Sequence, residues 1–159
     1  MIKNSIMNLI GFRLKSFDYQ IETIDELIKI EKFDKNEYNE NKMKTDIKHG
    51  ISLIEREDRP AKHQLNILFS VKAYKNNYRI DIKLEINALF IFDDDLSIKF
   101  TKEEKEEMLI VNGTAILFPY IRSVIYNITS FDTENNNIIM PVVNLSDLLN
   151  NNVETEQND

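Results

Sequence analysis

The feature that most restricts the fold of this chain is a strict alternation of apolar and polar residues over Tyr78–Phe92. Every even position of the segment is apolar, whereas the odd positions from 79 to 87 hold Arg, Asp, Lys, Glu and Asn. Because successive side chains of a strand point to opposite sides, the pattern predicts a β-strand with one buried side. Leu89 and Ile91 make the far end apolar on both sides, so we expect both sides to be covered there.

The segments before this strand continue the pattern. Leu65–Ala73 also alternates, and a polar turn at Lys75–Asn77 joins it to the first segment as a predicted antiparallel hairpin. Met43–Leu53 alternates again and leads into the hairpin through a predicted turn at Glu57–Lys62, which holds Pro60. The middle of the chain is therefore predicted to form three consecutive strands.

A further strand is predicted near the start of the chain. Leu9–Ile21 places Ile10, Phe12 and Leu14 on one face of that strand. The stretch that follows, Tyr19–Glu31, has two interpretations, a short helix or a continued strand with a bulge.

The second half of the chain changes to helical spacing. Thr101 and Glu104 form a capping box, which predicts that a helix begins there. Because Pro119 lacks a backbone N–H, it predicts either a kink in the helix or, as the favoured alternative, a longer helix that starts after a break near Gly113. Apolar residues then recur at three- and four-residue spacing, as expected for an amphipathic helix: Ile116, Leu117, Tyr120, Ile121, Val124, Ile125 and Ile128.

The rest of the chain is predicted in less detail. Ser130–Asn137 is expected to be a polar loop and Ile138–Val143 an extended apolar segment. Asn144 is expected to cap a short final helix that carries Leu145, Leu148 and Leu149. Residues 151–159 are predicted to be an acidic, disordered tail, so that 1–150 form the single domain.

Four strands followed by helices predict an α+β fold with a four-stranded antiparallel sheet, a long C-terminal helix and a short final helix. One helix covers at most one face of such a sheet. The final helix and the extended segment before it therefore add apolar surface that has no place in the core. Excess apolar surface indicates self-association or a binding groove.

The sequence offers little for catalysis. It has no cysteine to act as a nucleophile and no glycine-rich loop to hold phosphates. His49 and His63 have no partner at metal-ligand spacing. Asp93–Asp95 fits a solvated loop, because adjacent side chains of a strand cannot converge on one ion. We therefore expect a protein that is not an enzyme and has no metal or cofactor.

Charge and hydropathy narrow the expected partners. The formal net charge is −7, and beyond Arg122 the chain has no lysine or arginine and six acidic residues. This distribution disfavours nucleic-acid binding, which needs a basic face. The acidic end is expected to be a solvated tail, with a basic partner as the alternative. No signal peptide or membrane span is predicted, so we expect a cytoplasmic protein without membrane insertion.

One motif carries more specific information. Ala115–Arg122 reads Ala-Ile-Leu-Phe-Pro-Tyr-Ile-Arg, and it is followed by Ile125, Ser130 and the segment Pro141-Val142-Val143-Asn144-Leu145. This resembles the C-terminal half of the SecB family of export chaperones, in which an I-L-F-P-Y-x-R-x-x-I helix precedes a P-V-N motif. One additional valine stands within P-V-N here. The upstream strand order and the chain length agree with the same family.

The resemblance implies a homotetramer, built as a dimer of dimers, of protomers with a four-stranded sheet and a long helix. It implies an ATP-independent holdase that binds unfolded preproteins in apolar grooves and passes them to the motor SecA. A groove of adaptable apolar residues suits this role, because it holds many sequences without reading one. The family's SecA-contacting face corresponds to Asp81 and Lys83, and a lysine there weakens attraction to a basic segment of SecA.

The resemblance also assigns residues to roles. Phe118, Tyr120, Ile121 and Val124 are expected to lie in the helix packing and oligomer interface. Thr45 stands where the family usually has an aliphatic residue. The residues expected to bind the client peptide, unless they are ordinary core, are Met43, Ile47, Met140, Val142, Leu145, Leu148 and Leu149.

Three hypotheses follow. The chain is a SecB-like holdase for exported or other unfolded clients, a dedicated SecB-like chaperone of one partner such as an antitoxin, or an α+β domain without a chaperone role that binds a small ligand or is structural. Breadth of aggregation suppression separates the first two, and an enclosed pocket would favour the third.

Overall fold

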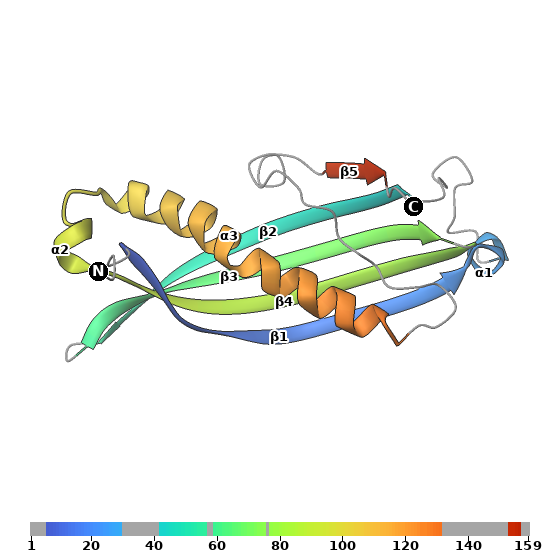
Figure 1. The fold of residues 1–159 in the computed structure, drawn as a ribbon, viewed down its shortest axis with the longest axis horizontal. Coiled ribbons are helices and arrows are strands. Elements are labelled where there is room, and N and C mark those ends of the chain that lie inside the picture. Colours follow the sequence, from blue (N-terminus) through green and yellow to red (C-terminus); the bar gives the residue numbers. More distant parts are fainter. Residues whose placement is uncertain (1–5, 30–41, 57–58, 76, 132–152, 157–159) are drawn as a thin grey trace.

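The computed structural model describes residues 6–29, 42–56, 59–75, 77–131 and 153–156. These residues form one antiparallel sheet of strand order β1-β4-β3-β2-β5, with a long helix lying diagonally across one face (Figure 1). The predicted four-stranded sheet and long helix are therefore confirmed, with β5 added at one edge. The elements are β1 (Met7–Thr23), α1 (Ile24–Lys29), β2 (Lys42–Arg56), β3 (Arg59–Lys75), β4 (Tyr78–Phe92), α2 (Asp94–Ser97), α3 (Lys102–Thr129) and β5 (Val153–Glu156).

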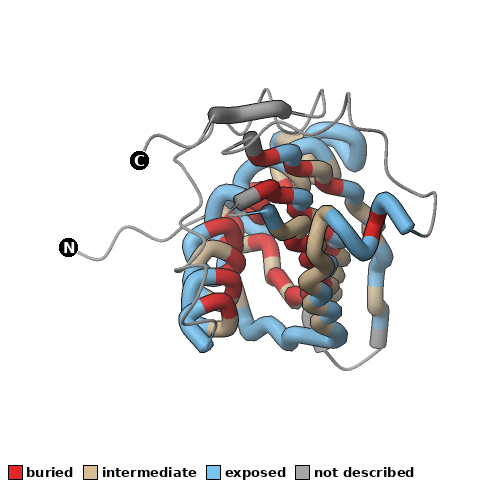
Figure 2. Tube along the Cα trace, turned by 90° about the vertical axis from the view of Figure 1, so that its right-hand side faces the viewer, coloured by how far each residue is buried: buried red, intermediate tan, exposed pale blue. Residues whose placement is uncertain are grey.

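β4 is the centre of the core. Its even positions from Ile80 to Phe92 are all buried, as the alternation predicts, and Leu89 and Ile91 on the opposite face are half-buried. The register of β3 aligns Leu65, Ile67, Phe69, Val71 and Ala73 with this buried row. Together these residues make the core face, which α3 covers (Figure 2). The other side of the sheet carries the polar residues, and we call it the polar face.

β1 follows its predicted course with two irregularities. The pairing with β4 shifts between Leu9 and Gly11 and again between Leu14 and Ser16, which marks two β-bulges. Phe12 and Leu14 lie opposite buried positions of β4, so they share the core face. Ile10 is the additional residue of the first bulge, so the predicted three-residue face holds for Phe12 and Leu14 only.

The connection between β2 and β3 differs from its prediction. The turn expected at Glu57–Lys62 overlaps β3, which already begins at Arg59 and pairs with Arg56. Pro60 is tolerated inside the strand because β3 pairs with β4 only from His63 onward, so this part of β3 has a free edge. The predicted turn before β4 is present, and Asn77 adopts a φ of 64°, a conformation that asparagine tolerates.

α3 is one continuous helix, so the predicted break near Gly113 is wrong. Thr101 caps it as predicted, because the Thr101 Oγ1 accepts a hydrogen bond of 3.1 Å from the Glu104 N–H. Pro119 lies inside the helix on its exposed side. Gly113 is buried and does not mark a break in the helix. A Cβ at this position would lie 2.8 Å from the Leu65 Cδ2. The glycine therefore permits a close approach of helix and sheet.

By length and composition alone, α3 would also suit a membrane span. Core helices of soluble proteins share these properties. Here α3 buries Leu109, Leu117, Ile121 and Ile125 against the sheet, which accounts for part of its apolar composition.

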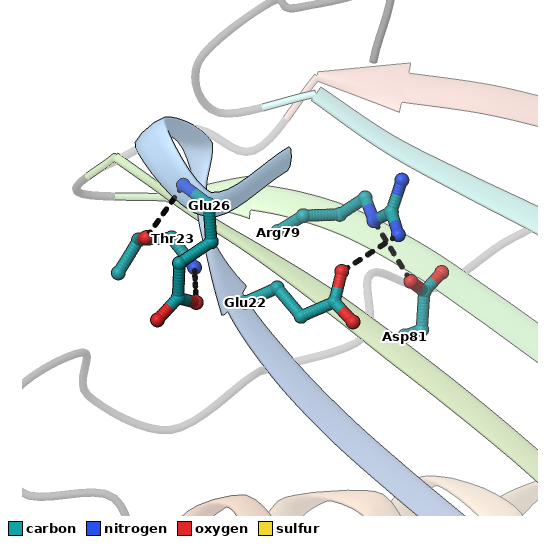
Figure 3. A network of polar contacts seen from close by, with 5 residues as sticks. All are labelled: Glu22, Thr23, Glu26, Arg79 and Asp81. Atoms are coloured by element: carbon teal, nitrogen blue, oxygen red, sulfur yellow. Dashed lines mark hydrogen bonds and ion pairs between the residues drawn. The ribbon is translucent and has the colours of Figure 1, made fainter. Parts of the chain in front are cut away.

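The ambiguous stretch after Tyr19 contains both predicted structures. β1 continues to Thr23, and α1 begins at Ile24. Thr23 and Glu26 form a reciprocal capping box: the Thr23 N–H donates to the Glu26 Oε2 and the Glu26 N–H donates to the Thr23 Oγ1, both at 3.1 Å (Figure 3). This T-x-x-E signal is present in the sequence and specifies the change from strand to helix.

Two further predictions concern the end of the chain. The extended segment Ile138–Val143 and the final helix capped by Asn144 lie outside the described residues. Val153–Glu156 fall within the predicted disordered tail, yet they form β5 and pair with Lys42–Thr45 of β2. The register places Glu154 and Glu156 opposite lysine residues, which gives this acidic segment a partner.

Candidate functional site

Exposed apolar residues gather where α3 crosses β1. The Phe12 and Tyr120 rings have centroids 4.6 Å apart, yet Phe12 is 40% exposed and Tyr120 is 45% exposed. Leu14 lies two residues along the same face of β1, and Ile116 lies one helical turn before Tyr120; both are also exposed. We call Phe12, Leu14, Ile116 and Tyr120 the α3–β1 surface. Exposed apolar residues that gather in this way are a candidate interaction site.

The outward side of α3 is apolar as well. Val111, Ala115, Pro119 and Tyr126 are exposed there, at positions that follow one side of the helix. Of the thirteen large apolar residues that are exposed in the described part of the chain, seven belong to β1 or α3. The helix therefore presents one apolar side to its own sheet and another to its surroundings.

The four residues predicted for the oligomer interface divide between these two sides. Phe118 and Ile121 face the sheet within the same chain, and the Phe118 ring packs edge-on against Phe69 with centroids 6.0 Å apart. Tyr120 is exposed and Val124 is half-buried. Tyr120 is therefore the predicted interface residue that lies most openly on the surface.

Only two of the seven residues predicted to bind a client lie in the described part of the chain. Met43 and Ile47 lie on the core face of β2 and are members of the core cluster, with 0% and 8% exposure. Thr45, between them in β2, is also buried. The remaining residues lie outside the described part of the chain: Met140, Val142, Leu145, Leu148 and Leu149. Their client-binding role stays a prediction.

The polar face carries alternating charges. Arg79 lies between two acids, with its Nη2 3.0 Å from the Glu22 Oε2 and its Nε 2.9 Å from the Asp81 Oδ2 (Figure 3). Lys15 pairs with Glu85 at 3.3 Å. Asp81, at the predicted SecA-contacting position, is thus partly neutralised by its neighbour.

Two hollows of about 440 and 430 Å³ open on this polar face. Their lining includes Lys44, Lys72 and Lys83 together with Asp18 and Asp46. Both are open and lined by charges of both signs. They lack the apolar, enclosed walls that a small-ligand site needs, so they do not favour the third hypothesis.

His49 lies on β2 and His63 lies on β3. Burial lowers the pKa of His49. Burial also lowers the pKa of His63; nearby Lys105 acts in the same direction and Glu106 opposes it. The His63 ring packs edge-on against Phe92 with centroids 4.8 Å apart. Both imidazoles are therefore held in their neutral form, which fits a packing role.

Asp93–Asp95 has a structural use. The Asp93 Oδ1 accepts a hydrogen bond of 2.9 Å from the Leu96 N–H and caps α2, while Asp94 and Asp95 are exposed. The predicted strand-end loop is thus the start of a short helix. Within the described ranges, no three potential ligands lie close enough to hold a metal ion.

No family model matches the sequence, and no curated protein matches it either. Among solved structures, one that is similar is the SecB-like chaperone Rv1957 of Mycobacterium tuberculosis in complex with a ChAD peptide from the HigA1 antitoxin. The TM-score is 0.57 at 13% identity, over 87% of this chain and 90% of that one. This chain has a SecB-like fold. A second similar structure is a Streptococcus agalactiae protein of unknown function, with a TM-score of 0.50 at 11% identity, over 86% of this chain and 97% of that one.

Sequence reasoning missed two features of the structure. It did not separate Phe12 and Leu14, which are exposed, from the apolar strand residues that are buried. The fact that β1 is an edge strand follows from the sheet order, and no pattern within β1 reports it. It also missed β5, for which the alternation Val-Glu-Thr-Glu at 153–156 was the available signal.

Proposed function

We propose that this chain is an ATP-independent holdase chaperone that belongs to the SecB type, binds non-native stretches of other polypeptides and is not an enzyme. The observation that carries the proposal is the apolar surface of α3 and β1, which one chain leaves exposed around Phe12 and Tyr120. The SecB-like fold supports it, because a similar fold in Rv1957 belongs to a chaperone bound to a peptide.

In this proposal the apolar surface has two uses. The α3–β1 surface joins copies of the chain into a homotetramer, a dimer of dimers, because a closed assembly hides apolar surface that the protomer cannot. The client binds beside β2, whose Met43 and Ile47 are themselves buried, and the predicted client-binding residues from Met140 to Leu149 are expected to contribute. Several weak contacts on one assembly then add up through effective concentration.

Two client ranges are compatible with this role. In the first, the chain holds many unfolded polypeptides, including preproteins for Sec-dependent export, in the cytoplasm. In the second, it protects a single partner such as an antitoxin, which the antitoxin peptide bound to Rv1957 supports. SecA is the less supported partner, because Asp81 is paired with Arg79 and followed on the polar face by Lys83.

The test is an aggregation-suppression assay without ATP, combined with the solution mass of the protein. Three unrelated denatured proteins and one candidate antitoxin serve as clients. Suppression of all four supports a general holdase, and suppression of the antitoxin alone supports a dedicated chaperone. A chain that stays monomeric and suppresses none of them is not a holdase of the SecB type.

A further inference from the structure

The outer edge of β2 is only partly paired. The inner edge of β2 pairs with β3 from Met43 to Arg56, whereas the outer edge pairs with β5 over Lys42–Thr45 alone. Among the described residues, no strand lies beside the outer edge of Asp46–Arg56. Where a strand edge is not paired, its N–H and C=O groups are a template for an added strand.

The charges on this edge select the kind of strand that fits. On the polar face, the register places Lys44 of β2 directly beside Lys72 of β3, and both side chains are exposed. Like charges in directly opposite positions destabilise a sheet. Asp81 follows Lys72 on the inner side, and Glu154 of β5 lies opposite Lys44 on the outer side. An acid at that outer position therefore offsets the repulsion between the two lysines.

The same pattern repeats two residues along β5. Glu156 lies opposite Lys42, while Val153 and Thr155 lie opposite Thr45 and Met43 on the core face. The strand that fits the edge thus has acids at alternate positions and β-branched residues between them, which also favour extended backbone.

We infer that the outer edge of β2 binds an extended segment of the partner polypeptide with acidic residues opposite Lys42, Lys44 and Lys48, and that β5 is the chain's own occupant of this edge. The inference rests on the proposed function and specifies the client class for it. β5 spans four residues, so a longer partner segment that also pairs with Asp46–Arg56 has more hydrogen bonds to gain. Displacement must overcome the high effective concentration of an attached strand.

The experiment uses two labelled peptides of equal length and apolar content. The first is Val-Glu-Thr-Lys-Val-Glu-Thr-Glu, which in the β5 register places its lysine opposite Asp46 and its acids opposite Lys42, Lys44 and Lys48. The second inverts every charge. Fluorescence anisotropy measures the affinity of both for the full chain and for a chain that ends at Asn152.

Removal of β5 is expected to raise the affinity for the first peptide by about tenfold or more, because it removes an intramolecular competitor. The shortened chain is expected to bind the charge-inverted peptide at least about tenfold more weakly, since it would repeat the like-charge contacts. The full-length variant Glu154→Lys/Glu156→Lys keeps the chain length and is expected to behave like the shortened chain. Equal affinity for both peptides, or no gain when β5 is removed or inverted, overturns the inference.

A matched pair of variants locates the site. Lys44→Glu is expected to abolish the preference for the acidic peptide. Lys83→Glu, an exposed lysine on the same face but on β4, is expected to leave it unchanged. Aggregation suppression measured on the same proteins separates the two proposals. If the protein suppresses aggregation but does not prefer the acidic peptide, the binding site at the β2 edge is rejected and the holdase function is not. If it prefers the acidic peptide but does not suppress aggregation, the holdase function is rejected and the binding site is not.

Discussion

At the scale of single residues, Gly113 sets the distance between α3 and the sheet. Its Cα stands where a side chain would meet Leu65 and Phe90, both fully buried. Glycine lowers helix propensity by roughly 1 kcal/mol relative to alanine. Gly113 therefore weakens the helix locally but permits closer packing against the sheet. The predicted break near this glycine does not form.

We expect Gly113→Val to lower the free energy of unfolding by about 2 kcal/mol, because even its Cβ would lie 2.8 Å from the Leu65 Cδ2 and overpack the contact between helix and sheet. Urea unfolding followed by circular dichroism measures this. Asn112→Val is the control, since it adds the same side chain to the neighbouring, exposed helix position. Equal losses for the two variants would show that helix propensity, and not packing, is responsible.

His49 and His63 make stability depend on pH. Their folded pKa values lie below the unfolded value of 6.5, so the unfolded chain binds more protons as the pH falls. The stabilisation from keeping both rings neutral is therefore complete above pH 6.5 and is lost as the pH falls toward the folded pKa values. We expect the melting temperature to fall between pH 7.5 and 5, and to fall less in His49→Asn/His63→Gln, in thermal scans over that range. An identical pH dependence in the double variant would contradict this.

At the scale of elements, α3 has two apolar sides with different tasks. Phe118 and Ile121 bind the helix to its own sheet, whereas Ile116 and Tyr120 continue onto β1 and stay exposed. Figure 1 shows that α3 crosses the sheet diagonally, and its buried residues Leu109, Leu117 and Ile125 follow the one side that faces the sheet.

Substitutions two residues apart in α3, on different sides of the helix, should therefore separate folding from assembly. Tyr120→Ser is expected to leave the free energy of unfolding of the protomer nearly unchanged and to lower the solution mass measured by light scattering. Phe118→Ser is expected to cost about 3 kcal/mol or more, because it leaves a cavity against Phe69. If the Tyr120→Ser protein has an unchanged solution mass, the α3–β1 surface is not part of the assembly interface.

The strands and the helix could be predicted because each has its own period: two for Tyr78–Phe92, and three to four for the residues after Thr101. Features that depend on neighbours could not. The bulge at Ile10 becomes visible only in the pairing with β4, and the role of Gly113 only in its contact with Leu65. Of the predicted site, Tyr120 lies on an exposed surface, whereas Met43 and Ile47 are buried in the core, because strand alternation reports a face and not what covers it.

At the scale of the whole molecule, the sheet has two edges of different character. β1 forms one edge over seventeen residues and has no partner strand on its outer side among the described residues; β2 forms the other and is partly paired by β5. β1 is interrupted by two bulges, which limit uncontrolled pairing along an edge.

If assembly covers the α3–β1 surface, the outer amides of β1 should exchange more slowly at high protein concentration. We expect hydrogen exchange of residues 9–17 to slow down at least about tenfold between dilute and concentrated samples, because assembly removes the local opening that exchange requires. Exchange in β3, which is paired on both sides, is the internal reference and should not change. Exchange of β1 that is independent of concentration would argue for a monomer.

The sheet order also has a consequence for how the chain is made. Met7 pairs with Phe92, so the first strand to leave the ribosome finds its neighbour only after the last strand of the central meander has been synthesised. Until then, the segment of β1 with Phe12 and Leu14 has no strand to pair with, and its apolar side chains are exposed to solvent. In the proposed function, finished copies of the protein bind this exposed segment of a copy that is still being synthesised.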